Sequence, residues 1–552
     1  MSDIVDHRLR RLWTPEGGAA APLPDRAVRW LVERIGVLGT TAPISPDSAI
    51  KVPDSRLSAG ARAELAAVVG ETQVLTDREE RLGRSGGLSY LDLIRRRAIG
   101  GRLPDGLAVP DAVVLPADPA QVQRVLEVCV AQNVAVVPFG GGTSVVGGVN
   151  ALRGDKASVI ALDLRRLDRL VSVDPVSRIA VLGAGVRAPE AERLLAAHGL
   201  TLGHVPQSFE RATIGGFAAT RSAGQASSGY GRFEDMVSGV RLATPAGEWR
   251  LGVAPASAAG PDLRQLAVGS EGALGVITEV ALRVRPVPVA RRYEGYVLDG
   301  WERGSAAVRE LAQRHVLADV TRLSDVDESE VSLALNAGPK TAALRGYLRA
   351  RGVTEPCLLI LGWECGSTRE ISLRRKETLR VLRKSGAVRI GRSLGESWRH
   401  GRFSGPRQRD ALLDQGVCVE TLETAAHWSK LSELRDAVRA ALRESLGSPI
   451  VMCHVSHAYE TGASLYFTAI AARRDDDPTG QWERAKLAAC EAITGGEGGP
   501  LGTISHHHAV GVDHAPYLGR EIGAVGLAVL AAAKQAVDPT GILNPGKLLR
   551  GS

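Results

Sequence analysis

The alternation of hydrophobic and polar positions changes near residue 111 of the chain. Before it, residues 41–58 are rich in Pro and Ser and predict a loop, and a short helical segment follows that ends at Gly70. After it, DAVVLP (111–116) predicts a strand, and apolar residues at helical spacing over 117–133 predict a helix with Asp118 near its start. VAVVPFGGG (134–142) predicts a strand that runs into a glycine-rich turn.

Further along the chain, apolar residues first recur at every second position, and later segments with strand-like and helical spacing follow one another. Residues 158–187 alternate as strands divided by short turns, and 189–199 predict a helix. Strand-like runs over 293–298, 358–364 and 462–474 are separated by helical segments between about 290 and 490. This texture predicts a second, α+β region built on an antiparallel sheet.

Composition agrees with an ordinary globular protein of two or three domains. The 552 residues are 44% hydrophobic and 23% charged. The formal charge of +7 is spread along the chain without a run of five or six like charges. We therefore expect no nucleic acid partner. We interpret the excess positive charge as serving to bind an anionic small molecule.

Six scattered cysteines, none in a C-x-x-C pair, argue against zinc and against a disulfide framework, and they predict buried free thiols. The start of the chain has no apolar segment of the kind found in secretory signals. No stretch approaches the roughly 18 apolar residues that span a bilayer. We predict a cytoplasmic protein, with peripheral membrane contact as a partner hypothesis.

Three glycine-rich blocks predict a wall of backbone donors around an anionic cofactor, because glycine lets N–H groups approach an oxygen without a Cβ. None is a Walker loop or a G-x-G-x-x-G fingerprint. The predicted cofactor residues are Pro138, Phe139, Gly140, Gly141, Gly142, Thr143 and Ser144 in the first block; Pro206, Gln207, Ser208, Thr213, Gly215, Gly216, Thr220, Arg221, Ser222 and Gly224 in the second; and Glu271, Gly272, Gly275, Val276 and Ile277 in the third.

The order PFGGGTS, TIGG and GSEGALGVIT, with a closing LNPGK (543–547), resembles the vanillyl-alcohol-oxidase (PCMH-type) superfamily of FAD enzymes. The resemblance implies an α+β fold: a PCMH-type FAD-binding domain of two α+β subdomains and an α+β cap with an antiparallel sheet. Many relatives bind FAD covalently through a histidine in the first glycine loop. Residues 138–150 contain no histidine or cysteine, so we predict non-covalent FAD.

Within that superfamily, ISHHH (504–508) and GASLYF (462–467) resemble the alkyldihydroxyacetonephosphate (alkylglycerone-phosphate) synthases. The resemblance implies a catalytic set of Tyr466, His506, His507, His508 and Arg322, with Tyr466 as acid/base beside the flavin. It also implies that Arg409 holds the substrate phosphate.

Read without the resemblance, the same residues allow other roles. In extended backbone, His506 and His508 would share a face and His507 would point away. A metal would need further ligands, and the sequence offers no obvious third or fourth residue, so we predict none. Arg322 could pair locally with Asp325, and Arg409 could be solvated in a basic loop.

Two strands carry the remaining candidates. A core role is the ordinary expectation for Tyr466 in an alternating strand; as a base it would need its pKa of about 10 lowered by a neighbouring cation. His454 and His457 fall on opposite faces of the preceding strand, so at most one should face a pocket, and we assign them no role.

We predict residues 1–107 as an N-terminal helical segment that begins the FAD domain, 108–288 as the PCMH-type domain, 289–500 as the cap and 501–552 as a return segment with the histidine triplet. The predicted reaction exchanges the acyl group of acyl-dihydroxyacetone phosphate, a phosphorylated ketone ester, for a long-chain fatty alcohol. The alternative is an FAD-linked 2-hydroxyacid dehydrogenase, and a third interpretation is a flavin-carrying scaffold without a substrate. A homodimer is a further hypothesis.

Overall fold

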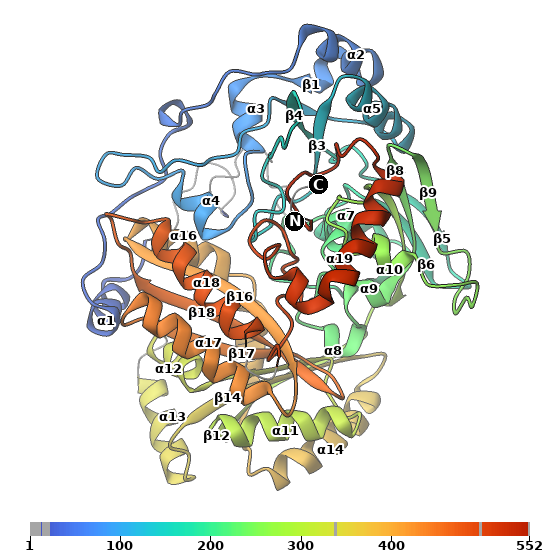
Figure 1. Ribbon diagram of the computed structural model, residues 1–552. Coiled ribbons are helices and arrows are strands. Elements are labelled where there is room, and N and C mark those ends of the chain that lie inside the picture. Colours follow the sequence, from blue (N-terminus) through green and yellow to red (C-terminus); the bar gives the residue numbers. More distant parts are fainter. Residues whose placement is uncertain (1–12, 14–21, 336–338, 496–498, 550–552) are drawn as a thin grey trace.

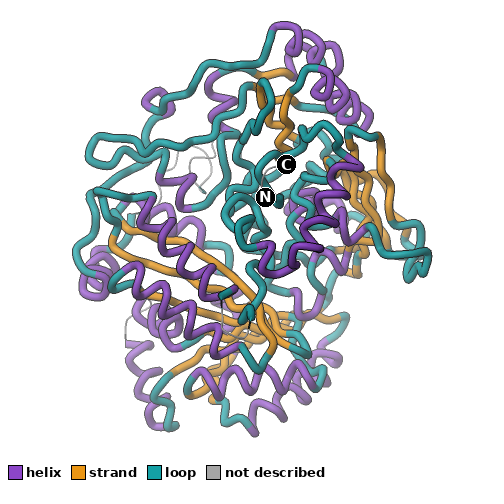
Figure 2. Tube along the Cα trace, viewed as in Figure 1, coloured by secondary structure: helices purple, strands orange, loops and turns teal. Residues whose placement is uncertain are grey.

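The computed structural model describes residues 13, 22–335, 339–495 and 499–549. Residues 1–12 and 14–21, which begin the predicted N-terminal segment, lie outside the described residues. Two sheet-bearing regions lie one above the other, and the C-terminal segment crosses back from the lower to the upper one (Figure 1). In the lower region strands are flanked by long helices, whereas loops occupy much of the upper centre (Figure 2).

The upper region contains a four-stranded sheet in the order β1-β2-β4-β3, with β2 and β3 parallel to β4. Its helix α5 begins as expected, because the Asp118 carboxylate accepts the Gln121 backbone N–H (2.8 Å) and Pro119 follows. The elements here are α1 (Asp25–Ile35), α2 (Ala59–Val69), α3 (Arg78–Gly83), α4 (Tyr90–Ile94), α5 (Pro119–Ala131), β1 (Val74–Leu75), β2 (Ala112–Val114), β3 (Val134–Phe139) and β4 (Ser158–Asp163).

A five-stranded antiparallel sheet, in the order β5-β6-β10-β8-β9, packs beside the first and shares a hydrophobic core with it. The two sheets give the two α+β subdomains that the resemblance implied. The elements are β5 (Leu170–Asp174), β6 (Ile179–Gly183), β7 (Leu200–Thr201), β8 (Val237–Thr244), β9 (Gly247–Leu251), β10 (Val276–Arg283), β11 (Arg285–Pro286), α6 (Ala188–Ala196), α7 (Ile214–Ala219), α8 (Ser227–Tyr230), α9 (Phe233–Met236) and α10 (Arg264–Ala267).

The lower region has a seven-stranded sheet, here called the cap sheet, in the order β15-β12-β14-β13-β17-β18-β16. All its strand pairs are antiparallel, which confirms the predicted antiparallel sheet. Its elements are β12 (Ala290–Asp299), β13 (Val320–Ser324), β14 (Pro356–Cys365), β15 (Val388–Gly391), β16 (Val417–His427), β17 (Ile450–Ala458), β18 (Gly462–Ala472), α11 (Trp301–Gln313), α12 (Val326–Leu335), α13 (Pro339–Ala350), α14 (Thr368–Lys384), α15 (Arg392–Gly401), α16 (Gly405–Asp414), α17 (Leu431–Leu446) and α18 (Gly480–Thr494).

Strand alternation divides the two faces of the cap sheet. On β18, Leu465 and Phe467 are fully buried in the core. Tyr466, Thr468 and Ile470 point to the other face, which borders a large cavity. Period-two patterning therefore decides which side chains of the cap can reach a ligand.

The C-terminal segment returns to the upper region. After the histidine triplet comes α19 (Leu518–Val537), drawn in red in Figure 1 beside the upper sheets. The chain then pairs with β3, where Val136 N–H donates to Ile542 O (2.8 Å) and Asn544 N–H donates to Val136 O (2.8 Å). The last residues thus complete the upper region.

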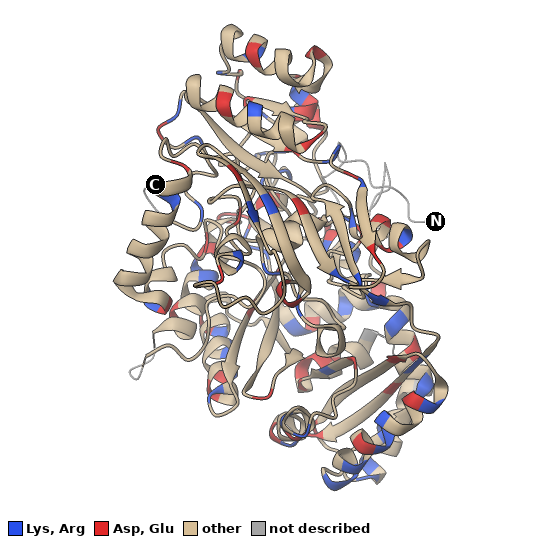
Figure 3. Cartoon of the chain, turned by 90° about the vertical axis from the view of Figure 1, so that its right-hand side faces the viewer, with Lys and Arg blue, Asp and Glu red and all other residues tan. Residues whose placement is uncertain are grey.

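Charge is less evenly distributed than expected. Residues 368–402 hold eleven lysines and arginines against three acidic residues, an excess of eight, whereas the entire chain has a net charge of +7. The prediction of a spread charge was therefore wrong: the excess belongs to α14, β15 and α15 of the cap. Figure 3 shows many basic positions on helices in the lower half of the molecule.

Two further predictions concern cysteines and membranes. All six cysteines are buried and free, which confirms the prediction of unpaired thiols. Within the described part of the chain, none of the helices has the length and apolar character needed to cross a bilayer.

Candidate active site

A cavity of about 1310 Å³ lies between the glycine-rich loops of the upper region and the inner face of the cap sheet. Nineteen of the twenty-two predicted cofactor residues line it, and so do Arg322, Arg409, Tyr466, His507 and His508. The cavity exceeds the roughly 300–1,000 Å³ usual for a single small ligand, so it has room for a cofactor and a substrate together.

Glycine forms the upper wall because the backbone segments touch one another. A Cβ on Gly141 would lie 2.6 Å from the Cα of Ala212 and from the carbonyl oxygen of Arg211. A Cβ on Gly215 would lie 2.6 Å from the Cβ of Ala184. These contacts hold three loops together and leave backbone polar groups facing the cavity, a lining that fits the diphosphate and ribose groups of FAD.

Three predicted cofactor residues lie outside this lining. Arg221 points away from the cavity and donates to the carbonyl oxygens of Gln265 (2.5 Å) and Val268 (3.0 Å). Val276 is fully buried in the core. The carbonyl oxygen of Gly224 is hydrogen-bonded to Nε2 of His457 (2.7 Å).

Arg322 enters the cavity from β13 with its charge already matched. Its Nη2 donates to Glu328 (2.8 Å) and lies 3.0 Å from Nδ1 of His454. The local partner is therefore Glu328 and not Asp325, which instead pairs with Arg439 and Arg435. Although burial acts to raise the pKa of Glu328, Arg322 and His454 outweigh it and hold the pKa well below its ordinary value.

Arg409, on α16, keeps more of its hydrogen-bonding capacity free. Its nearest acidic partner is Glu420, with Nη1 and Oε1 3.7 Å apart, which is too long for a hydrogen bond. Its Nε is buried, and no described residue accepts its proton. A guanidinium in this state is suited to binding a phosphate or a carboxylate.

Tyr466 stands between His454, whose ring stacks on it at 5.0 Å, and His507, at 6.2 Å. It borders the cavity, so the expectation of a purely structural residue does not hold. However, burial raises the pKa of its phenol to about 12. Arg409 acts to lower this pKa, but desolvation outweighs it, so at neutral pH the phenol keeps its proton and is suited to donate it.

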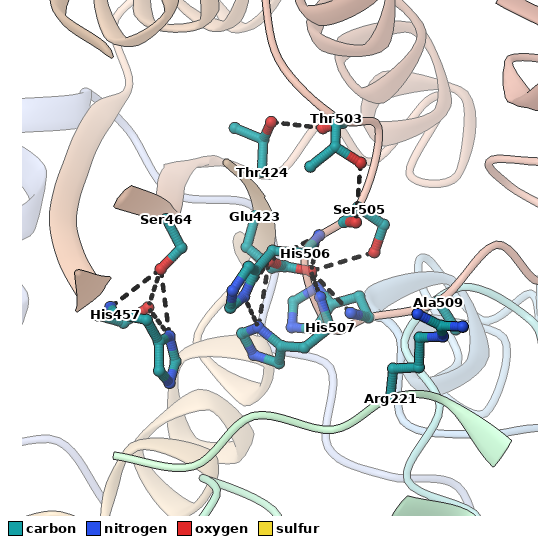
Figure 4. Close-up of polar contacts among 12 residues, drawn as sticks. Arg221, Glu423, Thr424, His457, Ser464, Thr503, Ser505, His506, His507 and Ala509 are labelled. Carbon is teal, nitrogen blue, oxygen red and sulfur yellow. Dashed lines mark hydrogen bonds and ion pairs between the residues drawn. The ribbon is translucent and has the colours of Figure 1, made fainter. Parts of the chain in front are cut away.

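The histidine triplet is bent around one carboxylate. Glu423, buried on β16, accepts the backbone N–H groups of His506 (3.0 Å), His507 (2.6 Å) and His508 (2.7 Å) (Figure 4). Because three consecutive N–H groups converge on one side chain, the segment cannot be extended. His507 and His508 therefore share the cavity and His506 lies behind them, which corrects the predicted arrangement.

Burial keeps most of these rings neutral. Desolvation lowers the pKa of His508 to about 3 and that of His506 well below its ordinary value. Burial alone would raise the pKa of Glu423, but His507 and the other two rings outweigh it and hold that pKa well below the usual range. The site thus contains one ionised carboxylate beside the neutral rings of His506 and His508.

The structure also supplies the third metal-ligating group that the sequence did not reveal. Nitrogen atoms of His457, His506 and His507 lie within 4.8 Å of one another, as do ligand atoms of Glu423, His507 and His508. Several of these atoms have protein partners: Nε2 of His457 is bonded to Gly224 O, and Nε2 of His506 to Tyr459 (2.6 Å). These contacts favour hydrogen bonding, and the absence of a metal stays a prediction.

Sequence reasoning missed three contributions to the site. Glu423 has a signal in hindsight, since it is one of two glutamates, with Glu420, in a strand that is buried over most of its length. His454 lines the cavity and His457 does not, as their alternation allowed. Helix α1 closes the far end with Trp30 and Leu31, which no local pattern could have shown.

Comparison with known proteins agrees with this geometry. The profile of an FAD binding domain matches residues 110–251, and that of the C-terminal domain of FAD linked oxidases matches residues 287–548. The alkyldihydroxyacetonephosphate synthase of Dictyostelium discoideum is 32% identical over 88% of this chain and 80% of its own length. Glycolate oxidase subunit GlcD of Bacillus subtilis is 26% identical over 81% of this chain and 90% of its own.

Solved structures give the same result. An alkyldihydroxyacetonephosphate synthase aligns with a TM-score of 0.83 and 27% identity over 99% of both chains. Substrate-bound p-cresol methylhydroxylase aligns with a TM-score of 0.64 and 16% identity over 89% of this chain and 97% of its own, which shows the fold alone.

The fold and the glycine-lined cavity define an FAD-dependent enzyme of the vanillyl-alcohol-oxidase, PCMH-type class. Within that class, the chain belongs to the alkyldihydroxyacetonephosphate synthase family.

Proposed function

We propose that the enzyme exchanges the acyl group of acyl-dihydroxyacetone phosphate for a long-chain alcohol. One observation carries the proposal: the glycine wall, a guanidinium with spare donors, a phenol and two imidazoles all face one cavity. A phosphorylated ester needs an anion anchor and groups that move protons, and the cavity presents both.

FAD would occupy the glycine-lined end of this cavity, held by the nineteen predicted cofactor residues that line it. We propose that it is bound non-covalently, since the first glycine loop contains neither histidine nor cysteine. When bound, the flavin would supply an electron-accepting ring system next to the substrate.

We assign Arg409 to the substrate phosphate, because among the described residues its guanidinium has an ion pair only with Glu420, at 3.7 Å. Arg322, held by Glu328, would present a fixed positive charge beside Tyr466. Tyr466 would donate a hydrogen bond or a proton, in keeping with its raised pKa, while His507 and His508 would accept protons. His506 would support His507 from behind.

The apolar part of the cavity suits a long alkyl chain. Apolar side chains from the cap strands, from helices α12, α15 and α16 and from the segment that contains α1 line it: Leu23, Trp30, Leu31, Val331, Leu358, Ile360, Leu394, Trp398, Leu412, Val419, Met452 and Ile470. An acyl chain buried here would gain about 0.8 kcal/mol per methylene.

The domain division follows the same chemistry. We propose that residues 1–107 and 108–288, with the return segment 501–552, form the FAD-binding unit, and that 289–500 form the cap. Support comes from the pairing of Ile542 and Asn544 with β3 and from the single seven-stranded sheet of the cap.

An anaerobic titration of the FAD-loaded enzyme tests the reaction. With acyl-dihydroxyacetone phosphate and a long-chain alcohol, we expect release of fatty acid without net reduction of the flavin. Bleaching of the flavin by a 2-hydroxyacid, without fatty acid release, would establish the dehydrogenase alternative. Purified protein that takes up FAD but reacts with neither class of substrate would favour the scaffold interpretation.

We further propose contact with an anionic membrane surface through α14. Arg369, Lys376, Arg383 and Lys384 are exposed on this helix, and Leu373 is 61% exposed among them. Basic amphipathic helices of this kind bind anionic bilayers. Sedimentation with vesicles of anionic but not zwitterionic lipid is expected, and it should weaken with salt.

A homodimer is the second partner proposal. Helix α19 exposes apolar side chains, with Val525 79% and Val529 59% accessible. Burial of such a face against a second copy would remove it from water. Analytical ultracentrifugation of the Val529→Lys variant should show a shift toward monomer. The cytoplasmic location stays a prediction.

A further inference from the structure

We propose that Glu423 is a positioning residue that fixes the tautomer of His507 and so makes His507 Nε2 the proton acceptor of the cavity. The inference rests on the proposed exchange reaction only for the identity of the proton donor. The geometry of the triplet carries the rest.

Glu423 first fixes the backbone of the triplet. Besides the three consecutive N–H groups, it accepts the hydroxyl of Ser505 (3.1 Å). A buried carboxylate that accepts this many hydrogen bonds is held ionised. The segment is also anchored beyond the triplet, where Glu271 of the upper region accepts the N–H groups of Val510 and Gly511 (both 2.8 Å). The triplet is thus held between a cap carboxylate and one from the upper region.

Glu423 then decides which ring nitrogen of His507 carries the proton. Its Oε2 lies 3.2 Å from Nδ1 of His507 and 3.5 Å from Nδ1 of His506. A carboxylate only accepts hydrogen bonds, so we place the proton on Nδ1 of His507, where the Glu423 carboxylate and Nδ1 of His506 share it. Nδ1 of His506, 2.9 Å from that of His507, is then an acceptor, and His506 carries its own proton on Nε2, which faces the Tyr459 oxygen (2.6 Å).

This tautomer leaves a lone pair on Nε2 of His507. The ring lines the cavity beside Tyr466, and among the described residues no hydrogen-bond partner is recorded for this nitrogen. A neutral imidazole backed by a carboxylate is an efficient base, because the imidazolium that forms is paired with the negative charge behind it. Tyr466 cannot take this role at neutral pH, since its phenol keeps its proton.

The charged and titratable neighbours of the ring come from every element packed around it. They are Glu423 of β16, His454 and His457 of β17, Tyr466 of β18, His204, the adjacent His506 and His508, and Arg232, which donates to the His506 carbonyl oxygen. Of these, Glu423 is the acidic group in direct contact with the ring.

The proton balance of the exchange follows. As the alcohol oxygen bonds to the substrate carbon, its proton passes to His507 Nε2. The bond from that carbon to the acyl oxygen breaks, and the fatty acid leaves as a carboxylate. His507 then returns the proton to that carboxylate or to water, so that the imidazole is regenerated without oxidation or reduction.

Histidine-selective ¹⁵N NMR of the FAD-loaded, full-length enzyme tests the tautomer without any substrate. We expect the His507 ring, assigned by its loss in His507→Gln, to show a protonated Nδ1 and an unprotonated Nε2. A wild-type His507 protonated on Nε2 overturns the proposal, and this outcome needs no folded variant of Glu423.

Kinetics provide the second readout, with Glu521→Gln as a matched control. Glu521 also tethers this segment, through the N–H of Ile504 (2.9 Å) and the hydroxyl of Thr503 (2.8 Å), but no hydrogen bond joins it to a histidine of the described chain. In Glu423→Gln, we expect kcat to fall about 100-fold with little change in KM, because general base catalysis is worth roughly 10²- to 10⁴-fold. Glu423→Asp should restore part of the loss, and Glu521→Gln should lose far less.

The outcomes separate this proposal from the proposed function. Equal losses in Glu423→Gln and Glu521→Gln would mean that Glu423 only anchors the loop, which refutes the positioning role. If the wild type releases no fatty acid at all, the exchange reaction fails, and the NMR result still decides the tautomer.

Discussion

The two walls of the cavity are built in opposite ways. The upper wall depends on side chains being absent: Gly141 and Gly215 let separate backbone segments approach so closely that a Cβ would collide at 2.6 Å. The cap wall depends on side chains being held: Arg322 by Glu328, and the histidine triplet by Glu423. Backbone groups are sufficient to bind a large cofactor whose structure does not vary. Proton transfer, in contrast, needs side chains that are held in a fixed orientation.

The difference also appears in electrostatics. Glu423 and Glu328 lie beneath the cap wall with pKa values held below the ordinary range. At the upper wall, burial raises the pKa of Glu271 to about 7. Ionised carboxylates therefore support the catalytic side, and the cofactor side tolerates a partly protonated one.

The largest expected effect comes from comparing substitutions of the two candidate proton carriers of the cap wall, His507 and Tyr466. His507→Gln should reduce kcat by roughly 10²- to 10⁴-fold, the usual contribution of a general base. Tyr466→Phe should lose about tenfold, because its phenol serves as a donor. Steady-state rates of fatty acid release measure both. If Tyr466→Phe lowered kcat more than His507→Gln did, and abolished the change of kcat with pH near neutrality, Tyr466 rather than His507 would be the base.

A second variant tests the phosphate anchor of the cap wall. Arg409→Gln should raise KM by roughly 10- to 100-fold, because hydrogen bonds to charged groups contribute about 1.5–3 kcal/mol. FAD content should stay at the wild-type level, which absorbance at 450 nm would show. An unchanged KM would mean that the phosphate lies elsewhere in the cavity.

A third variant tests the upper wall. Gly141→Ala should weaken FAD binding by roughly 10- to 100-fold, since overpacking against backbone costs about 1–3 kcal/mol. Fluorescence titration of the apoprotein with FAD measures this. The control is Gly346→Ala on α13, where a Cβ meets nothing within 4 Å. Equal affinity in the two variants would contradict the argument that the glycine wall is closely packed.

The smallest effect concerns pH and stability. Native Glu271 keeps its proton to about pH 7, whereas an unfolded glutamate loses it near pH 4.3, so between these values the native state binds more protons. The free energy of unfolding should therefore fall as pH rises through this window, by at most about 1.4 kcal/mol per pH unit. Urea unfolding at several pH values measures how the free energy of unfolding depends on pH. In Glu271→Gln this dependence should be weaker between about pH 4.3 and pH 7. The same dependence in the variant and the wild type would contradict the raised pKa of Glu271.

Local sequence determined much of the upper wall. Period-two strands, the Asp118 cap of α5 and the glycine blocks depend on interactions within a few residues, and nineteen of the predicted cofactor residues reach the cavity. Alternation along one strand also allowed only one of His454 and His457 to face the cavity, and His454 does.

Tertiary structure decided the rest. The triplet bends because Glu423, more than eighty residues earlier, gathers its N–H groups, so His507 and His508 face the cavity where an extended chain would present His506 and His508. The partner of Arg322 and the closing role of α1 depend likewise on segments distant in sequence. A backbone N–H donates to any suitably placed carboxylate, so its partner is known only when the fold has brought that carboxylate into reach.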